Sequence, residues 1–323
     1  MDRRSFIIGT SAAVAVGPAL AQEAFPSHAI TIINAFPPGG VNDIVTRPLA
    51  SAMEPILKQP VVVETKAGAG GQVGAQVGAN AKPDGYTILS HNTGISGYAA
   101  VDQLFDRQPK ATRADFITLA RLVADPVVLL VNEQQPHKTL KDFVDDAKAR
   151  PGQIPYGSSG PYGTLHVAME MFAASAGIKL LHVPFRGAGP ALTALLSGTV
   201  QALASAPGVL KQQVDDGKMR VLANWGAQRI ASFPDLLTFR ELGYKDVEFY
   251  IWAGLFAQSA LPAPIMTRLR EAMAQAVKAP EVVKTFETAG SPVAYQDAPE
   301  FSKFVAEDSA RLVAAVKKIG KVE

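Results

Sequence analysis

Asn34 to Asp43 reads N-A-F-P-P-G-G-V-N-D and joins an apolar strand to a helix through two prolines and two glycines. The preceding residues, 30–33, are all β-branched, which indicates a short buried strand. Glycine lets an outside group approach the main chain, and Asn42 or Asp43 can cap the helix that follows. The stretch therefore predicts helix N–H groups that face a small anion. A plain strand-to-helix connection without a ligand explains these residues equally well, so the rest of the chain has to decide.

The composition is that of an ordinary soluble globular protein with room for two domains. The 323 residues are 48% hydrophobic and 19% charged. A net charge of +2, without a Lys/Arg run that contains aromatic residues, argues against a nucleic-acid partner. The absence of cysteine excludes disulfides, thiolate metal sites and a cysteine nucleophile.

The N-terminus predicts export. Arg3 and Arg4 precede a run of mostly small apolar residues, 6–20, and Ala19 to Ala21 match the A-x-A cleavage pattern. The run contains glycine and proline and is shorter than the roughly 20 apolar residues that span a bilayer, which argues against a membrane anchor. We expect a signal peptide at residues 1–21, cleavage after Ala21 and a periplasmic mature chain. The Sec and Tat export routes both stay open.

Short apolar strands alternate with amphipathic helices along the rest of the chain, which is typical of an α/β protein with largely parallel sheets. The glycine-rich loop Gly68 to Gly71 opens onto a helix, but Val73 stands where a dinucleotide fingerprint needs its third glycine. A third strand ends at residues 90–93, and open α/β sheets bind ligands at the carboxyl ends of their strands. After helical and irregular segments, the next strand is expected at Val127 to Val131.

A second set of glycine- and hydroxyl-rich helix starts occurs between about residues 157 and 205. Ser158, Ser159 and Thr164 place hydroxyl and N–H groups at the start of one helix, an arrangement that favours anions. Two lobes that face each other would bring this set and the set before residue 95 to one cleft.

Six motifs occur in order along nearly the whole mature chain: F-P-P-G-G-V-N-D (36–43), P-V-V-V-E-T-K-A-G-A-G-G (60–71), P-D-G-Y-T-I-L (83–89), Y-G-S-S-G (156–160) with His166, H-V-P-F-R-G (182–187) and W-A-G-L-F-A (252–257). The ordered set resembles the extracytoplasmic solute receptors of tripartite tricarboxylate transporters, the Bug-type receptors. Asn34 and Ala35 depart from the family pattern, where Val and Pro are frequent, which leaves the geometry of the first loop open.

The resemblance implies a type II-like periplasmic binding protein. Such a protein has two α/β domains with mixed, mostly parallel sheets, joined by a hinge that the chain crosses twice. We expect domain 1 to contain residues 22–124 and 228–323, and domain 2 to contain residues 125–227.

The resemblance also implies a monomer that binds a small carboxylate, with no cofactor or metal, and delivers it to a membrane permease. The ligand would be a di- or tricarboxylate, an amino acid or an aromatic acid, held mainly by backbone groups and ordered waters. One side of the site would contain Phe36, Pro38, Gly39, Gly40, Asn42 and Asp43, with Gly68, Ala69 and Gly70 close by. The residues expected to face them are Ser158, Ser159, Thr164, Arg186 and Gly187. Ligand choice would rest on His91, Asn92, Thr93, Ala204 and Ser205.

Three alternatives stay open. A serine hydrolase needs G-x-S-x-G, whereas residues 157–160 read G-S-S-G, and no histidine pair has the spacing of a catalytic zinc site. A sensory receptor that docks on a membrane kinase fits the sequence as well as a transport receptor does. Arg186 either grips the carboxylate directly or pairs across the interdomain surface.

Overall fold

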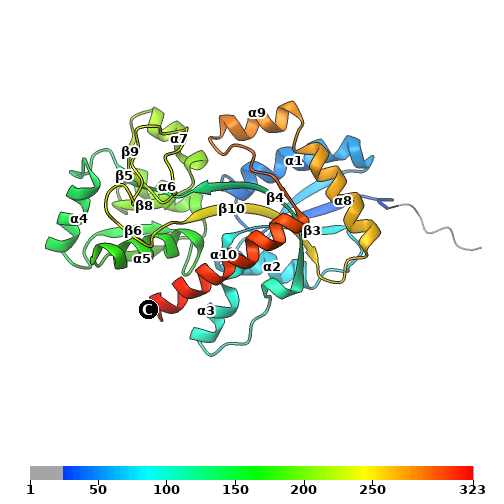
Figure 1. Cartoon of the computed structure of the whole chain (residues 1–323), viewed down its shortest axis with the longest axis horizontal. Helices are drawn as coiled ribbons and strands as arrows, with labels where there is room; N and C mark the ends of the chain where they lie inside the picture. The colour runs from blue at the N-terminus through cyan, green and yellow to red at the C-terminus, as the bar shows by residue number, and fades with distance from the viewer. Residues whose placement is uncertain (1–24, 323) are drawn as a thin grey trace, which may run out of the picture.

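The computed structural model describes residues 25–322, which form two α/β lobes side by side, each built on its own sheet (Figure 1). The predicted signal peptide lies outside the described residues. The strand order in the first sheet is β11-β4-β10-β3-β1-β2, and in the second it is β7-β6-β8-β5-β9. The two α/β domains expected from the sequence are therefore present.

The first sheet contains β1 (Ile30–Asn34), β2 (Val61–Thr65), β3 (Thr87–Asn92), β4 (Phe116–Pro126), β10 (Tyr250–Gln258) and β11 (Gln296–Asp297). The second contains β5 (Val128–Asn132), β6 (Pro155–Ser158), β7 (Leu181–Pro184), β8 (Ala202–Ser205) and β9 (Met219–Asn224). The α-helices are α1 (Val41–Leu57), α2 (Gln72–Ala79), α3 (Tyr98–Leu104), α4 (Leu140–Ala149), α5 (Thr164–Ala176), α6 (Ala188–Leu196), α7 (Pro207–Asp215), α8 (Ala263–Ala276), α9 (Pro280–Thr288) and α10 (Ala298–Ile319).

Both sheets are mixed, as predicted, but the expected majority of parallel ladders is not observed. β1 pairs in parallel with β2 and β3, and β6 pairs in parallel with β7 and β8. The remaining five ladders between described strands are antiparallel. The reason is that the strands adjoining the hinge, β4, β10 and β5, run antiparallel to all of their neighbours.

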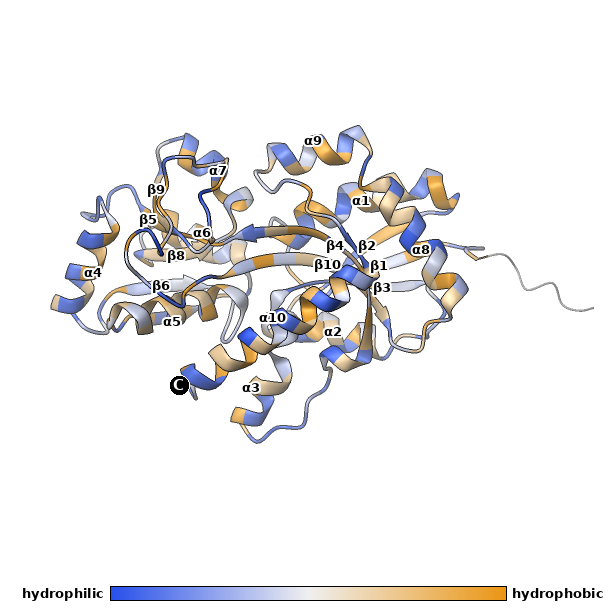
Figure 2. Ribbon diagram, in the orientation of Figure 1, coloured by the Kyte–Doolittle hydropathy of each residue, from blue (hydrophilic) through white to orange (hydrophobic). Residues whose placement is uncertain are grey.

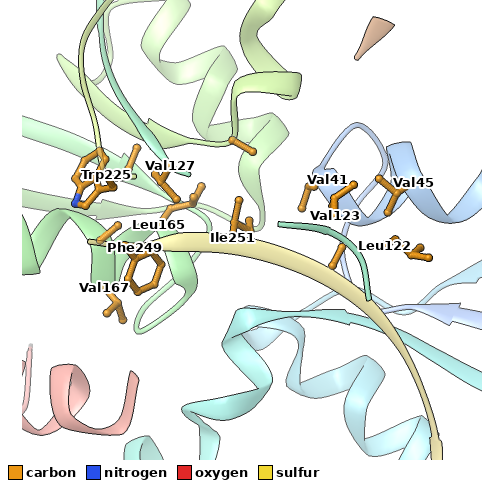
Figure 3. Close-up of a cluster of buried hydrophobic side chains, with 14 of the residues drawn as sticks. Val41, Val45, Leu122, Val123, Val127, Leu165, Val167, Trp225, Phe249 and Ile251 are labelled. Carbon is orange, nitrogen blue, oxygen red and sulfur yellow. The ribbon is translucent and has the colours of Figure 1, made fainter. Parts of the chain in front are cut away.

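β4 and β10 carry the chain between the lobes. β4 ends at Pro126 and β5 begins at Val128, so the chain passes from one sheet to the other through Val127 alone. Val127 donates its N–H to the Phe249 carbonyl (3.4 Å) and accepts from the Trp225 N–H (2.8 Å), which joins both crossings. Figure 3 shows buried side chains along this path, from Trp225 and Phe249 in one lobe to Val41 and Val45 in the other.

The irregular segment between β9 and β10 packs on the second lobe. The Phe239 ring lies 4.6 Å from Phe172 of α5 and 4.5 Å from Trp225, centroid to centroid. Tyr244 makes an edge contact with the same Phe172 ring, and Thr238 bridges to Asn224. We therefore propose that domain 2 extends to about residue 249, whereas the sequence places its end at residue 227.

Helix α10 reaches from the first lobe to the second. Its first turn is held at β4, where Thr118 Oγ1 donates to the Ala298 carbonyl (3.1 Å). Past its far end, Tyr162 Oη donates to the Gly320 carbonyl (2.9 Å) and accepts from the Val322 N–H (2.7 Å). Apolar and charged residues alternate around the helix, and Phe301, Val305, Leu312 and Val316 are buried (Figure 2). The C-terminal residues therefore link the two lobes.

Two searches of residues 25–322 gave no candidate. No helix there is long and apolar enough to cross a membrane. That same part of the chain holds no group of three His, Cys, Asp or Glu side chains suited to a metal ion.

Candidate functional site

The loop between β1 and α1 is held in shape by Asn34 and Asp43. Asn34 is fully buried; its Nδ2 donates to Asp43 Oδ1 (3.3 Å) and its Oδ1 accepts from the Phe36 N–H (3.2 Å). Asp43 also accepts from the Gly39 N–H (3.2 Å) and from Arg47 Nε (2.7 Å). Gly39 has φ +82°, a conformation that glycine adopts without strain. Asn34, a departure from the family pattern, thus fixes the loop, and Asp43 is engaged within the protein.

A cavity of about 30 Å³ lies between the lobes, where four helices begin. Its helical lining comes from α1 (Gly40, Val41, Asn42), α5 (Thr164, Leu165), α6 (Ala188) and α7 (Ala206, Val209). The remaining lining residues are Phe36, Pro37, Asn92, Ser159, Ser205 and Ile251. The first amides of a helix have no intrahelical acceptor and carry the positive end of its dipole. None of these lining side chains is charged, so the cavity offers an anion neutral hydrogen-bond donors rather than a cation.

The two lobes touch each other around this cavity. Thr164 Oγ1 donates to Asn92 Oδ1 across the cleft at 3.4 Å. A Cβ added to Gly160 would come within 3.8 Å of the Gly70 nitrogen, so the backbones also approach closely. A free volume of about 30 Å³ corresponds to roughly one water molecule. The lobes therefore enclose the cavity in a closed arrangement.

A second cavity of about 180 Å³ adjoins the first and shares Phe36, Pro37 and Ser159 with it. Its other lining residues are Ala35, Gly68 to Gly71, Gly160, Pro161 and Pro184 to Gly187. Arg186 is its one charged lining residue, and the side chain is exposed. An anion approaching the cleft therefore meets this guanidinium outside the cavity where the helices begin.

His91 lies behind Phe36 rather than in either cavity. Its Nε2 is 2.5 Å from Tyr98 Oη, its Nδ1 accepts from the Asn92 N–H (2.8 Å), and its ring lies 5.0 Å from that of Phe36. Burial lowers the pKa of His91 to about 4, so the imidazole is neutral at neutral pH. A Cβ on Gly71 would come within 2.5 Å of His91 Nε2, so this packing requires glycine there. His91 thus supports the wall that Phe36 forms.

Ser158 is also buried outside both cavities. Its Oγ lies 2.6 Å from His182 Nε2, and the His182 ring stacks on His166 at a centroid distance of 4.0 Å. Burial lowers the pKa of His182 to about 4, and burial together with His182 lowers the pKa of His166 to about 3. Ser158 Oγ accepts from the Gly160 N–H (3.2 Å) as well. The serine and histidine therefore shape the loop before α5 and do not face the cleft.

Comparison with known proteins identifies the family. The model of the tripartite tricarboxylate transporter family receptor matches residues 45–321. The chain belongs to this receptor family. It is 33% identical over 334 residues to a Cupriavidus necator protein described as "UPF0065 protein in gbd 5'region", which covers 99% of this chain and 98% of that protein.

Two solved structures resemble the receptor over almost its full length. Periplasmic binding protein BugD is 27% identical with a TM-score of 0.83, covering 92% of this chain and 99% of BugD. MatC from Rhodopseudomonas palustris with bound malate is 27% identical with a TM-score of 0.83, covering 90% of this chain and 100% of MatC. The periplasmic-binding-protein fold expected from the sequence is confirmed.

The sequence-derived site residues of the receptor fall into three groups. Those that line the first cavity are Phe36, Gly40, Asn42, Asn92, Ser159, Thr164 and Ser205. Those that line the second, beside Phe36 and Ser159, are Gly68, Ala69, Gly70, Arg186 and Gly187. Pro38, Gly39, Asp43, His91, Thr93, Ser158 and Ala204 line neither cavity. Thr93 serves the hinge instead, because its hydroxyl donates to the Tyr250 carbonyl (3.2 Å) and accepts from the Trp252 N–H (3.1 Å).

Sequence reasoning missed several residues that line the first cavity of the receptor: Pro37, Val41, Leu165, Ala188, Ala206, Val209 and Ile251. Most are apolar and carry no chemical signal of their own. Leu165 and Ala188 could have been found from their position, because each is among the first two residues of a helix that follows a glycine-rich loop.

Proposed function

We propose that this receptor is exported to the periplasm, captures a small carboxylate between its two lobes and delivers it to a membrane permease of the tripartite tricarboxylate type. One observation carries the proposal: four helices begin at an uncharged cavity between the lobes. Backbone N–H groups at helix starts bind anions through hydrogen bonds and the helix dipole together. MatC, with its bound malate, supports a carboxylate as the anion.

Capture requires the lobes to move. A four-carbon acid is several times larger than the roughly one water molecule that fits the cavity of about 30 Å³. The hinge of β4 and β10 provides such a movement, since the crossing narrows to Val127 and to the segment entering Tyr250. We infer that the acid enters an open form and that closure then brings the helix starts of both lobes onto it.

The cavity also has an apolar side for the body of the ligand. Val41, Leu165, Val209 and Ile251 contribute aliphatic side chains from both lobes and the hinge. These residues favour a compact carbon skeleton. Binding, rather than catalysis, is the role proposed for this site, because the buried Ser158–His182 contact lies outside it.

A thermal-shift screen of di- and tricarboxylates, amino acids and aromatic acids on the mature chain tests the proposal. A ligand that binds only the folded form raises the melting temperature by mass action. Ala188→Leu places a larger side chain at the cavity and is expected to abolish the response. Ala174→Leu makes the same change at an exposed position of α5, away from both lobe-closing cavities, and should leave the response intact. A response to sugars or cations alone would rule out the carboxylate.

Delivery and export have tests of their own. Uptake of the radiolabelled acid should fall when the receptor gene is deleted and recover with the wild-type gene but not with Ala188→Leu. Cell fractionation with N-terminal sequencing should find the protein in the periplasm, beginning at Gln22. Normal uptake in the deletion strain would contradict the transport role even if the acid binds.

A further inference from the structure

Three polar side chains form a buried chain beside the first cavity. Asn42 Nδ2 donates to Ser90 Oγ at 3.1 Å, and Ser90 Oγ lies 2.7 Å from Thr46 Oγ1. Asn42, Ser90 and Thr46 are each at most 1% exposed. The amide nitrogen of Asn42 is therefore engaged within the protein, at the carboxyl end of β3.

The amide oxygen of Asn42 is left without a partner. Asn42 lines the first cavity, and its Oδ1 is a buried side-chain oxygen with no hydrogen bond. The other amide oxygen at this cavity, Asn92 Oδ1, accepts from the Gly94 N–H (3.0 Å) and from Thr164 Oγ1 (3.4 Å). The hydroxyls of Ser159 and Ser205 can rotate to donate or to accept, whereas a carbonyl oxygen can only accept. A buried acceptor without a donor is costly, so Asn42 Oδ1 requires a donor from the occupant of the cavity.

A plain carboxylate cannot supply that donor. Its oxygens only accept hydrogen bonds and would be repelled by Asn42 Oδ1. Asn42 is the second residue of α1, so its Oδ1 lies beside the first-turn amides that suit a carboxylate. The donor must therefore sit close to that carboxylate in the ligand.

Resting on the proposed function, we propose that the ligand is an acid with a hydroxyl or ammonium group on the carbon next to a carboxylate, and that Asn42 Oδ1 selects for this donor. Asn42 then acts as a specificity-determining residue, while the helix starts bind the carboxylate common to all candidate acids. A site built around such a hydrogen bond rejects the analogue that lacks the donor, because its own polar group is then left unpaired.

Matched acids measured by calorimetry on the mature wild-type chain test the inference. One set is succinate, malate and aspartate; the other is glutarate, 2-hydroxyglutarate and glutamate. Within a set that binds, the hydroxy or amino acid should bind at least about tenfold more tightly than the unsubstituted diacid, from the typical cost of an unpaired buried acceptor. Comparison of the hydroxy acid with the amino acid then tells which donor is used.

Two variants connect the preference to Asn42. Asn42→Leu removes the acceptor and should reduce the preference to less than about threefold, within the scatter of such contacts. Thr46→Val disturbs the same buried chain without removing Asn42 Oδ1 and should keep the preference. If Asn42→Leu does not fold, the ratio in the wild-type protein decides alone. Equal affinity for the substituted and unsubstituted acids would overturn the inference while leaving the proposed function intact; failure of every acid to bind would overturn both.

Discussion

Pro37 and Gly187 meet across the cleft at a distance that leaves no room for a side chain on Gly187. A Cβ built on Gly187 would lie 2.6 Å from Pro37 Cγ, and Gly187 has φ +121°. Pro37 belongs to the first loop of one lobe, and Gly187 precedes α6 of the other. The closed form therefore depends on glycine at this point.

Gly187→Ala is expected to hold the lobes apart and weaken ligand binding by more than about tenfold, which corresponds to roughly 1.4 kcal/mol. Gly152→Ala is the matched control, because Gly152 has φ +72° in the same lobe but no atom within 4 Å of an added Cβ. Both variants strain the backbone, and Gly187→Ala alone obstructs closure. Calorimetric titration measures the effect, and similar affinities for the two variants would argue against it.

Asp125 should make stability fall as pH rises. This residue lies on β4 beside the hinge, is 4% exposed, and has a pKa raised by burial from its ordinary 3.8 to about 7, although a hydrogen bond from Ser291 opposes the shift. The folded state keeps the proton between pH 4 and 7 while the unfolded state loses it, so the free energy of unfolding declines across that window. Asp125→Asn should remove the decline. Urea unfolding from pH 4 to 8 compares the two proteins, and parallel profiles would contradict this account.

His182 should act in the opposite direction. Burial lowers its pKa from 6.5 to about 4, so the folded state disfavours the charged ring. The contribution of neutral His182 to stability is complete above pH 6.5 and is lost as pH falls toward 4. His182→Gln should weaken this acid sensitivity, whereas His28→Gln, at an exposed position, should not. Acid-induced unfolding followed by circular dichroism provides the measurement; equal slopes in all three proteins would count against the assignment.

Arg186 is expected to attract the acid without gripping it. Its exposed guanidinium lines the outer cavity, whereas the helix starts line the inner one. Arg186→Ala should slow association several-fold at low salt and leave dissociation nearly unchanged, because exposed charges act mainly on the association rate. Stopped-flow fluorescence at two salt concentrations measures both rates, with the exposed Arg240→Ala as control. A loss of affinity above about a hundredfold that persists at high salt would indicate a direct clamp.

Local signals predicted most helices well. The helix predicted for residues 164–176 has those bounds in α5, and the capping box of Thr139 and Asp142 begins α4 where the sequence indicated. The prediction missed β4, because Arg121, Asp125 and Pro126 interrupt its apolar pattern. β4 is a strand because it pairs along its length with β10, whose residues lie more than a hundred positions later. Such a partner leaves no local trace in the sequence.

The site shows the same division. Ser159, Thr164 and Asn92 carry polar groups at strand ends and helix starts, so their chemistry indicated them. Ile251 and Val209 reach the cavity only through the hinge and the packing of α7, which sequence alone does not reveal. His91 and Ser158 were reactive candidates by residue type, yet their hydrogen bonds with Tyr98 and His182 take place inside the lobes.

The absence of charged side chains around the inner cavity has an evolutionary consequence. Attraction for a carboxylate resides there in main-chain groups, which mutation of side chains does not remove. Substitutions at Asn42, Ser205 or Ile251 can therefore change which acid fits while the attraction for its negative charge is inherited unchanged. A gene duplicate of such a receptor can acquire a new nutrient by a few neutral-to-neutral replacements, without first losing the ability to bind anions.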